Sequence, residues 1–262
     1  MLCPAPDNSP GEMPPPVPGG GYGEPMLGLV NQGQVEPVLK RIAEATQTLL
    51  RATIRFDEDD WRAPSLLPGW SRAHVATHIA RNADALRVLI SASRTGDPAP
   101  LYASANAKFN DIENGAERTA LELQVDLDTS AGELARLCDR VHDWIVPVRL
   151  PGGEFPLSVL SIIRLQELTL HHIDLRTGFT WSDIDIVPAR WLLQWMLLLL
   201  GDDPSLPAFD LISDAGVTAS LGGTGERRTV TGPDAALWAW LTGRTDGEGV
   251  SDAGGVTWPL AG

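Results

Sequence analysis

Three residues in two distant stretches of the chain have the types and spacing of metal ligands. Glu167 and His171 lie four residues apart in a segment with a helical pattern, so both side chains would project from one helix face about one turn apart. His78 lies in a second strongly helical segment. Two histidines and one carboxylate leave a tetrahedral zinc ion one open position, as in catalytic zinc sites. The sequence therefore predicts a metalloenzyme.

A purely structural interpretation of these residues stays open at this point. His78 and His171 could be satisfied core histidines, and Glu167 could form an ion pair with Arg164, three residues earlier on the same helix. His172, about 100° further around the helix, is the alternative to His171 as a ligand. The segment is apolar around most of its circumference, however, so buried Glu167 and His171 would be costly unless they were paired or bound a metal.

Four long helical patterns position these residues and predict a four-helix bundle, in which ligands on facing helices meet in the core. The third helix has two candidate starts, the capping-box pair Ser130 and Glu133 or an earlier start near Thr119. A polar turn at 57–60 follows the first helix, and residues 101–118 are expected to form a short helix or ordered loop around Tyr102 and Phe109. The four predicted helices are 35–53, 71–94 with Ser71 as N-cap, a helix whose buried face reaches Trp144, and 158–176 with Ser158 as N-cap.

After Gly178 the pattern changes to that of a small α/β domain. Short strand-like segments are separated by turns, and the glycine-rich stretch 222–225 is expected to be a hairpin turn. The predicted elements are helices 188–200 and 234–243 and strands 208–213, 217–220, 227–231 and 256–258. The chain is therefore expected to be an α+β protein with a disordered Pro/Gly-rich tail at 1–33, a bundle at 34–178 and an α/β domain at 179–262.

Composition narrows the classes of partner. The formal charge is −14 and the basic residues form no cluster, which argues against nucleic acid or an anionic membrane surface as a partner. The apolar run 191–200 is too short to span a bilayer. The chain has only two cysteines and begins without a secretory signal pattern, so we expect a cytoplasmic protein without a disulfide framework.

Beyond these patterns, four stretches resemble the mycothiol-dependent maleylpyruvate isomerase family, which belongs to the DinB-like group of metalloenzymes. They are residues 67–86, 167–175, 230–234 and 241–244, and the resemblance extends over about residues 35–260. It implies a DinB-like bundle that binds a divalent metal, usually zinc, through His78, Glu167 and His171. It also implies an active site between the bundle and the C-terminal domain, where Arg244 helps to hold the thiol cofactor mycothiol or the substrate.

Two residues near the predicted ligands affect how this resemblance is applied. Asn82 lies one turn beyond His78 and could orient a ligand or contact the cofactor, although a hydrogen bond along the helix face is an equal alternative. The family pattern has an arginine immediately before the ligand Glu167, where this chain has Gln166. Loss of that cation predicts weaker recognition of a carboxylate.

Arg244 also has a structural alternative to its role in the site, because a cation at a helix C-terminus complements the helix dipole.

The sequence supports three alternative functions. The first is a metal- and mycothiol-dependent cis–trans isomerase that acts on maleylpyruvate or a similar cis-enoyl keto acid. The second is a mycothiol S-transferase that joins this low-molecular-weight thiol to an electrophilic metabolite, and the third is a non-catalytic protein that binds a metal or small molecule. The expected partners are a small electrophilic substrate and the thiol, and the expected oligomeric state is a monomer or homodimer.

Overall fold

The computed structural model describes residues 32–95, 104–150, 153–201, 203–256 and 258. Almost all of the predicted Pro/Gly-rich tail lies outside these residues. The described chain divides mainly into two compact units, residues 35–150 with 154–178 and residues 179–262. That these units are separate folding domains stays a prediction. No helix among the described residues is long and apolar enough to cross a membrane.

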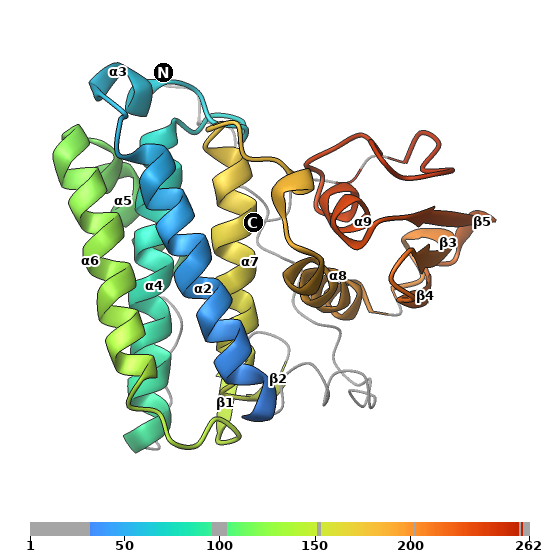
Figure 1. Ribbon diagram of the computed structural model, residues 1–262, viewed down its shortest axis with the longest axis horizontal. Coiled ribbons are helices and arrows are strands. Elements are labelled where there is room, and N and C mark those ends of the chain that lie inside the picture. The colour runs from blue at the N-terminus through green and yellow to red at the C-terminus, as the bar shows by residue number, and fades with distance from the viewer. Residues whose placement is uncertain (1–31, 96–103, 151–152, 202, 257, 259–262) are drawn as a thin grey trace, which may run out of the picture. The chain divides into compact units, whose positions relative to one another are not determined.

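The first unit is the predicted four-helix bundle (Figure 1). A hydrogen bond between Thr53 Oγ1 and Gln124 Oε1, 3.0 Å long, joins the first of its four long helices to the third, and the second helix packs against the third and the fourth. The long helices are α2 (Gln32–Thr53), α4 (Arg72–Thr95), α6 (Ala120–Cys138) and α7 (Val159–Asp174). Two shorter helices, α3 (Glu58–Arg62) and α5 (Ala105–Ala116), complete the helical part of this unit.

The start of α4 is fixed by a reciprocal pair of hydrogen bonds. The His74 backbone N–H donates to Ser71 Oγ over 3.4 Å, and the Ser71 backbone N–H donates to His74 Nδ1 over 3.2 Å. This arrangement has the geometry of a capping box in which histidine takes the place of the usual glutamate or glutamine. The backbone N–H of Leu66 also donates to Asp174 O over 2.9 Å, which ties the loop before α4 to the end of α7. Both contacts help to set which face of α4 meets α7.

Helix α7 is buried around nearly its whole circumference, as its apolar pattern predicts. Fourteen of its sixteen residues are buried. Two details of its ends differ from expectation. Ser158 at the N-cap position has helical dihedral angles and makes no side-chain capping bond. The helix ends at Asp174, two residues before the predicted end.

Other predictions for the first unit were wrong in position or type. Helix α6 begins after Thr119, whose side chain forms the capping box with Glu122, so the earlier of the two candidate starts is confirmed and the one at Ser130 and Glu133 is wrong. The helix ends at Cys138, and Trp144 therefore lies beyond it. The expected polar turn at 57–60 is instead the start of α3, since Asp57 and Asp60 form a capping box of their own.

A two-stranded sheet in this unit was not predicted. Strands β1 (Pro147–Leu150) and β2 (Gly153–Pro156) pair with each other just before α7. Only Val148 and Phe155 in these short strands are buried, so neither strand shows an alternating pattern long enough to be recognised. Residues 151 and 152, between these two strands in sequence, and Tyr102, in the segment expected to be a short helix or ordered loop, lie outside the described residues.

The second unit combines a mixed sheet with helices and confirms the α+β class. Its sheet has the order β4 (Thr218–Leu221), β3 (Pro207–Ser213), β5 (Thr224–Gly232), and β3 pairs antiparallel with β4 and parallel with β5. The remaining elements are a short 3-10 helix η1 (Trp181–Asp183), α8 (Ile186–Leu200) and α9 (Asp234–Leu241). Phe209 on β3 packs edge-to-face against Trp240 on α9, with ring centroids 5.5 Å apart, so sheet and helix share one core.

The glycine-rich stretch after β4 is not a hairpin turn, because β4 and β5 lie on opposite sides of β3. The chain passes around the start of β3, where the N–H of Gly223 donates to Leu206 O over 3.0 Å. Gly222 has φ +66°, and a Cβ there would lie 2.0 Å from Pro207 O, so only glycine fits this crossing. The strand predicted at 256–258 was also wrong, since residues 256 and 258 are not in a strand.

Candidate metal centre

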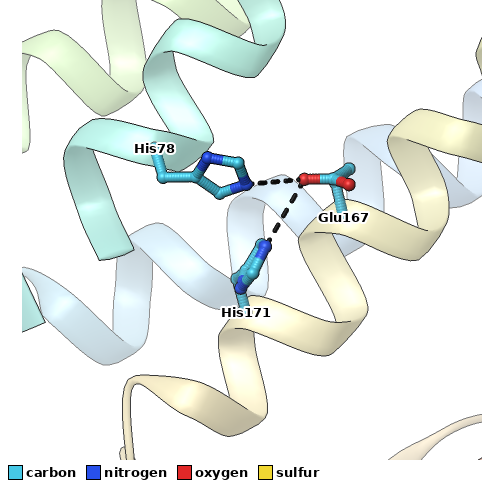
Figure 2. Close-up of side chains that lie close together, drawn as sticks. All are labelled: His78, Glu167 and His171. Carbon is cyan, nitrogen blue, oxygen red and sulfur yellow. Dashed lines mark hydrogen bonds and ion pairs between the residues drawn. The ribbon is translucent and has the colours of Figure 1, made fainter. Parts of the chain in front are cut away.

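The three residues selected from sequence lie together inside the first unit (Figure 2). His78 projects from α4, and Glu167 and His171 project from adjacent turns of α7. Glu167 Oε2 lies 2.9 Å from His78 Nε2 and 3.4 Å from His171 Nε2, and one ligand atom from each residue lies within 4.8 Å of the others. The structure thus brings together side chains 89 residues apart in sequence.

The spacing of these atoms suits a small cation. Ligands about 2.0–2.1 Å from a tetrahedral zinc ion lie roughly 3.3–3.4 Å from one another. The separation of 3.4 Å between Glu167 Oε2 and His171 Nε2 matches that value, and the separation of 2.9 Å between Glu167 Oε2 and His78 Nε2 is shorter. All three side chains are buried, and their relative exposures are 4%, 6% and 1% for His78, Glu167 and His171. Little rearrangement would be needed for the group to bind one ion.

A fourth residue, Asp174, fixes the orientation of His171. Its Oδ2 atom lies 2.8 Å from His171 Nδ1, and the carboxylate side chain has no exposed surface. A carboxylate that holds the distal nitrogen of a histidine fixes the tautomer, which leaves Nε2 as the metal-binding atom. This role of Asp174 was not predicted from the sequence. The signal was present, since residues three apart on a helix are neighbours.

Burial and hydrogen bonding set the protonation states of the group. Burial lowers the pKa of His78 to about 4, so its imidazole is neutral at neutral pH. Burial alone would raise the pKa of Glu167, but His171 Nε2, 3.4 Å away, and the hydrogen bond with His78 hold that pKa well below its usual range. Burial alone would lower the pKa of His171, but its bonds to Asp174 and Glu167 raise that pKa above its ordinary value. A neutral His78 and a His171 that holds its proton more tightly than a free imidazole therefore flank an ionised carboxylate.

The resulting charge balance matches a divalent cation. Without a metal, two carboxylates, Glu167 and Asp174, lie against His171, which carries at most one positive charge, so the buried group carries an excess negative charge. A divalent ion that replaced the His171 proton would leave two neutral imidazoles, two carboxylates and a neutral total. Because unpaired charge is costly in a buried site, this balance favours binding of a divalent ion. The group could hold a metal ion.

Trp70 borders the centre and was not singled out from sequence. Its ring centroid lies 5.7 Å from that of His78 and 6.2 Å from that of His74, with which it is stacked. Trp70 is only half-buried, so it forms a partly exposed apolar wall next to a ligand. The rings of His78 and His171 meet edge-to-face with centroids 4.6 Å apart, which restricts the rotation of both ligands.

The remaining predicted site residues have other surroundings. Asn82 is buried, and its Oδ1 accepts a hydrogen bond from Arg164 Nη1 over 2.8 Å. Its predicted contact with a cofactor stays a prediction. Arg244 belongs to the second unit, where its Nη1 donates to Thr242 O over 2.7 Å, and its assignment to the site also stays a prediction. His172 is buried, but the convergent group contains His171 rather than His172.

A helical bundle with two histidines and a glutamate meeting in its core defines a class of candidate metal-binding bundles. Comparison with known protein families identifies the family to which the chain belongs. The family described as the mycothiol maleylpyruvate isomerase N-terminal domain matches residues 42–176, which is more than half of the chain. The chain belongs to this family. The matched region contains all three candidate ligands.

Solved structures give the same fold. A crystal structure of the mycothiol-dependent maleylpyruvate isomerase superposes with a TM-score of 0.75 at 24% sequence identity, covering 87% of this chain and 97% of that chain. A crystal structure of a mutant of that enzyme, with one histidine replaced by alanine, gives the same values. At this identity the likeness establishes the fold. No curated protein sequence matched the chain.

Proposed function

We propose that this protein is a metal- and mycothiol-dependent isomerase that converts maleylpyruvate or a similar cis-enoyl keto acid into its trans isomer. The observation that carries the proposal is the buried convergence of His78, Glu167 and His171 in a member of this family. The solved structure with the same fold is that of an enzyme with this activity, which supports the same reaction class here.

The metal proposed for the centre is zinc, held by His78 Nε2, His171 Nε2 and a carboxylate oxygen of Glu167. The donor set fits zinc, which takes imidazole nitrogen and carboxylate oxygen and, in catalytic sites, has three protein ligands. When bound, such an ion supplies an open coordination position and lowers the pKa of a thiol that enters it. A free thiol has a pKa near 8.5 and is only slightly ionised at neutral pH, so this activation increases the nucleophile concentration.

The reaction then needs no nucleophile from the chain. Mycothiol, when bound, would supply a thiolate that adds reversibly to the cis double bond, so that rotation about the resulting single bond followed by elimination would give the trans isomer and return the thiol unchanged. This fits the only described cysteine, Cys138, because burial raises the pKa of its thiol to about 12 and makes it a poor nucleophile.

The residues of the first unit contribute binding, orientation and exclusion of water. Asp174 holds the His171 ring with its Nε2 toward Glu167, and the edge-to-face contact with His171 fixes the His78 ring. The half-buried Trp70 is proposed to shield one side of the reacting sulfur from water, since it lies against His78. Arg244 is proposed to bind a carboxylate of the thiol cofactor or substrate, as the family resemblance implies.

The test is a turnover assay with the zinc-loaded protein. Maleylpyruvate with catalytic mycothiol should show a change in its ultraviolet absorption that depends on both metal and thiol. Glu167→Gln should lose this activity together with the metal, while the matched control Glu133→Gln, at a surface ion pair with Arg87, should keep both. Absence of thiol-dependent turnover in protein that carries one zinc per chain would refute the isomerase assignment but not the metal site.

A mycothiol S-transferase is the second candidate, and Gln166 is the observation that favours it. A neutral side chain stands where the family pattern has a cation next to the ligand glutamate, which fits a substrate with less negative charge. A transferase would form one stable thioether per substrate and consume mycothiol in equal amount. An isomerase would leave the mycothiol concentration unchanged, so mass spectrometry of the thiol pool distinguishes the two reactions.

A further inference from the structure

The two histidines of the candidate metal centre are held in place in different ways. His171 Nδ1 lies 2.8 Å from Asp174 Oδ2, whereas the buried Nδ1 of His78 has no hydrogen-bond partner among the described residues. A metal-binding histidine generally donates its second ring N–H to an acceptor, which fixes the orientation of the ring. The orientation of the His78 ring therefore depends on packing.

Two aromatic rings pack against the His78 ring. One is His171, with ring centroids 4.6 Å apart and an interplanar angle of 84°, and the other is Trp70, with centroids 5.7 Å apart and an angle of 58°. Because His171 is itself a candidate ligand, Trp70 is the ring that can hold His78 from outside the set of ligands.

The backbone of Trp70 is fixed by the loop that precedes α4. Its N–H donates to Leu67 O over 3.1 Å, and its carbonyl oxygen accepts hydrogen bonds from the N–H and the hydroxyl of Ser65 over 2.9 and 2.8 Å. Ser65 is itself buried. Both backbone polar groups of Trp70 are thus paired, which restricts the position from which the indole projects.

His74 supports the indole of Trp70 one helical turn before His78. The two rings are stacked, with centroids 6.2 Å apart and an interplanar angle of 28°. The Ser71 N–H donates to His74 Nδ1 over 3.2 Å, so this nitrogen is an acceptor, and Ser71 Oγ lies only 2.6 Å from it. The ring proton is then on Nε2, which lies 3.5 Å from Glu113 Oε1 on α5. The His74 ring therefore has a polar neighbour at each nitrogen, and these neighbours limit its rotation.

We propose that Trp70 and His74 are positioning residues for the candidate ligand His78. The stacked pair holds the His78 ring so that Nε2 faces Glu167 Oε2, 2.9 Å away, and this packing takes the place of a hydrogen bond at Nδ1. His74 and His78 are four residues apart on α4 and lie on one face of the helix, so one indole can pack against both rings. The inference rests on the proposed metal centre and adds to it the residues that orient one ligand.

The test is a titration of the metal-free full chain with cobalt(II), whose visible absorption bands depend on the geometry of its ligands. Zinc has a filled d shell and gives no such bands. Trp70→Ala should weaken cobalt affinity about tenfold and change these bands, because the His78 ring loses its support. Trp70→Phe keeps an aromatic ring and should restore both properties toward the wild type. His74→Ala should weaken cobalt affinity by about two- to tenfold, since it removes one aromatic contact of the indole.

Phe109→Ala is the matched control. It removes an aromatic ring that is 49% exposed on α5 in the same unit, so it should bind cobalt as the wild type does. A double-mutant cycle separates positioning of His78 from a general loss of stability. In a His78→Ala background, Trp70→Ala should change the remaining cobalt affinity by less than about twofold. A tenfold loss that persists in this background would overturn the inference, because the indole would not act through His78.

The remaining outcomes distinguish this inference from the proposed function. A wild-type chain that binds neither cobalt nor zinc would refute the metal centre and overturn the inference with it. Wild-type affinity and absorption bands in Trp70→Ala, with native circular dichroism, would overturn the inference and leave the metal centre in place. Wild-type affinity in His74→Ala would overturn the role of His74, and this comparison does not depend on whether Trp70→Ala folds.

Discussion

Replacing Asp174 with asparagine tests whether its carboxylate supports metal binding through His171. The Oδ2 atom lies 2.8 Å from His171 Nδ1 and is fully buried, so Asp174→Asn keeps the shape and an acceptor but removes the charge. A hydrogen bond to a charged group contributes about 1.5–3 kcal/mol, against about 0.5–1.5 kcal/mol between neutral groups. The difference of roughly 1–2 kcal/mol predicts zinc affinity that is about 5- to 30-fold weaker.

The assay is competition for zinc against a chelator of known affinity, repeated over a range of pH. In the wild type, zinc competes with a proton for His171, whose pKa is raised. Asp174→Asn should lower that pKa, so the proton competes less strongly with zinc in the variant. The loss of affinity in the variant should therefore be smallest at acidic pH and largest at alkaline pH. Asp126→Asn is the control, because this carboxylate pairs with Arg81 and Arg118 away from the centre and should leave zinc affinity unchanged. Equal affinity of Asp174→Asn and wild type at alkaline pH would refute the reasoning.

Four other outcomes are expected. Glu167→Gln should reduce bound zinc to well below one per chain by elemental analysis, because it removes the only carboxylate ligand of the centre. Zinc affinity of the wild type should fall by about tenfold per pH unit below the raised pKa of His171, as measured by chelator competition, since one proton then competes with the metal. Gly222→Ala should destabilise the chain by more than about 2 kcal/mol in urea unfolding, because its φ is +66° and its new Cβ would lie 2.0 Å from Pro207 O. Arg244→Ala should raise KM for thiol or substrate with little change in kcat, and an unchanged kcat/KM would remove Arg244 from the site.

The helical periodicity of apolar residues predicted the bundle well, because this pattern depends only on residues close together in the sequence. The apolar stripes of α2, α4 and α7 recur at helical spacing over many residues, and the observed ends of these helices lie within three residues of the predicted ones. The start of α6 was ambiguous because two capping boxes were available, and the sequence does not show which one the tertiary packing uses. At Thr119 the box ends a tight turn after α5, whereas Ser130 is buried inside α6.

Non-local pairing limited the prediction of the second unit. The two glycines after β4 have the composition of a hairpin turn, yet the chain there passes around the start of β3 and pairs β5 on the other side. Which strands become neighbours depends on the packing of the sheet against α9, as in the contact between Phe209 and Trp240. A local pattern of turn residues contains no information about that choice.

The candidate ligands were predictable because charge in an apolar helix is itself a signal. Glu167 and His171 lie on α7, where apolar residues recur around most of the helix, and burial of their polar groups without a partner would be costly. His78 required a further step, since its own helix shows only that it borders a core stripe. Asp174 was missed because a carboxylate near a helix C-terminus is common at the surface, and only the fold shows that it is buried against His171.

The most direct test of the metal centre is a crystal structure of the zinc-loaded protein with anomalous diffraction measured at the zinc edge. The expected result is one peak per chain, about 2.0–2.2 Å from Nε2 of His78, Nε2 of His171 and a carboxylate oxygen of Glu167. A fully occupied zinc peak elsewhere, with these three side chains still in contact only with one another, would contradict the assignment.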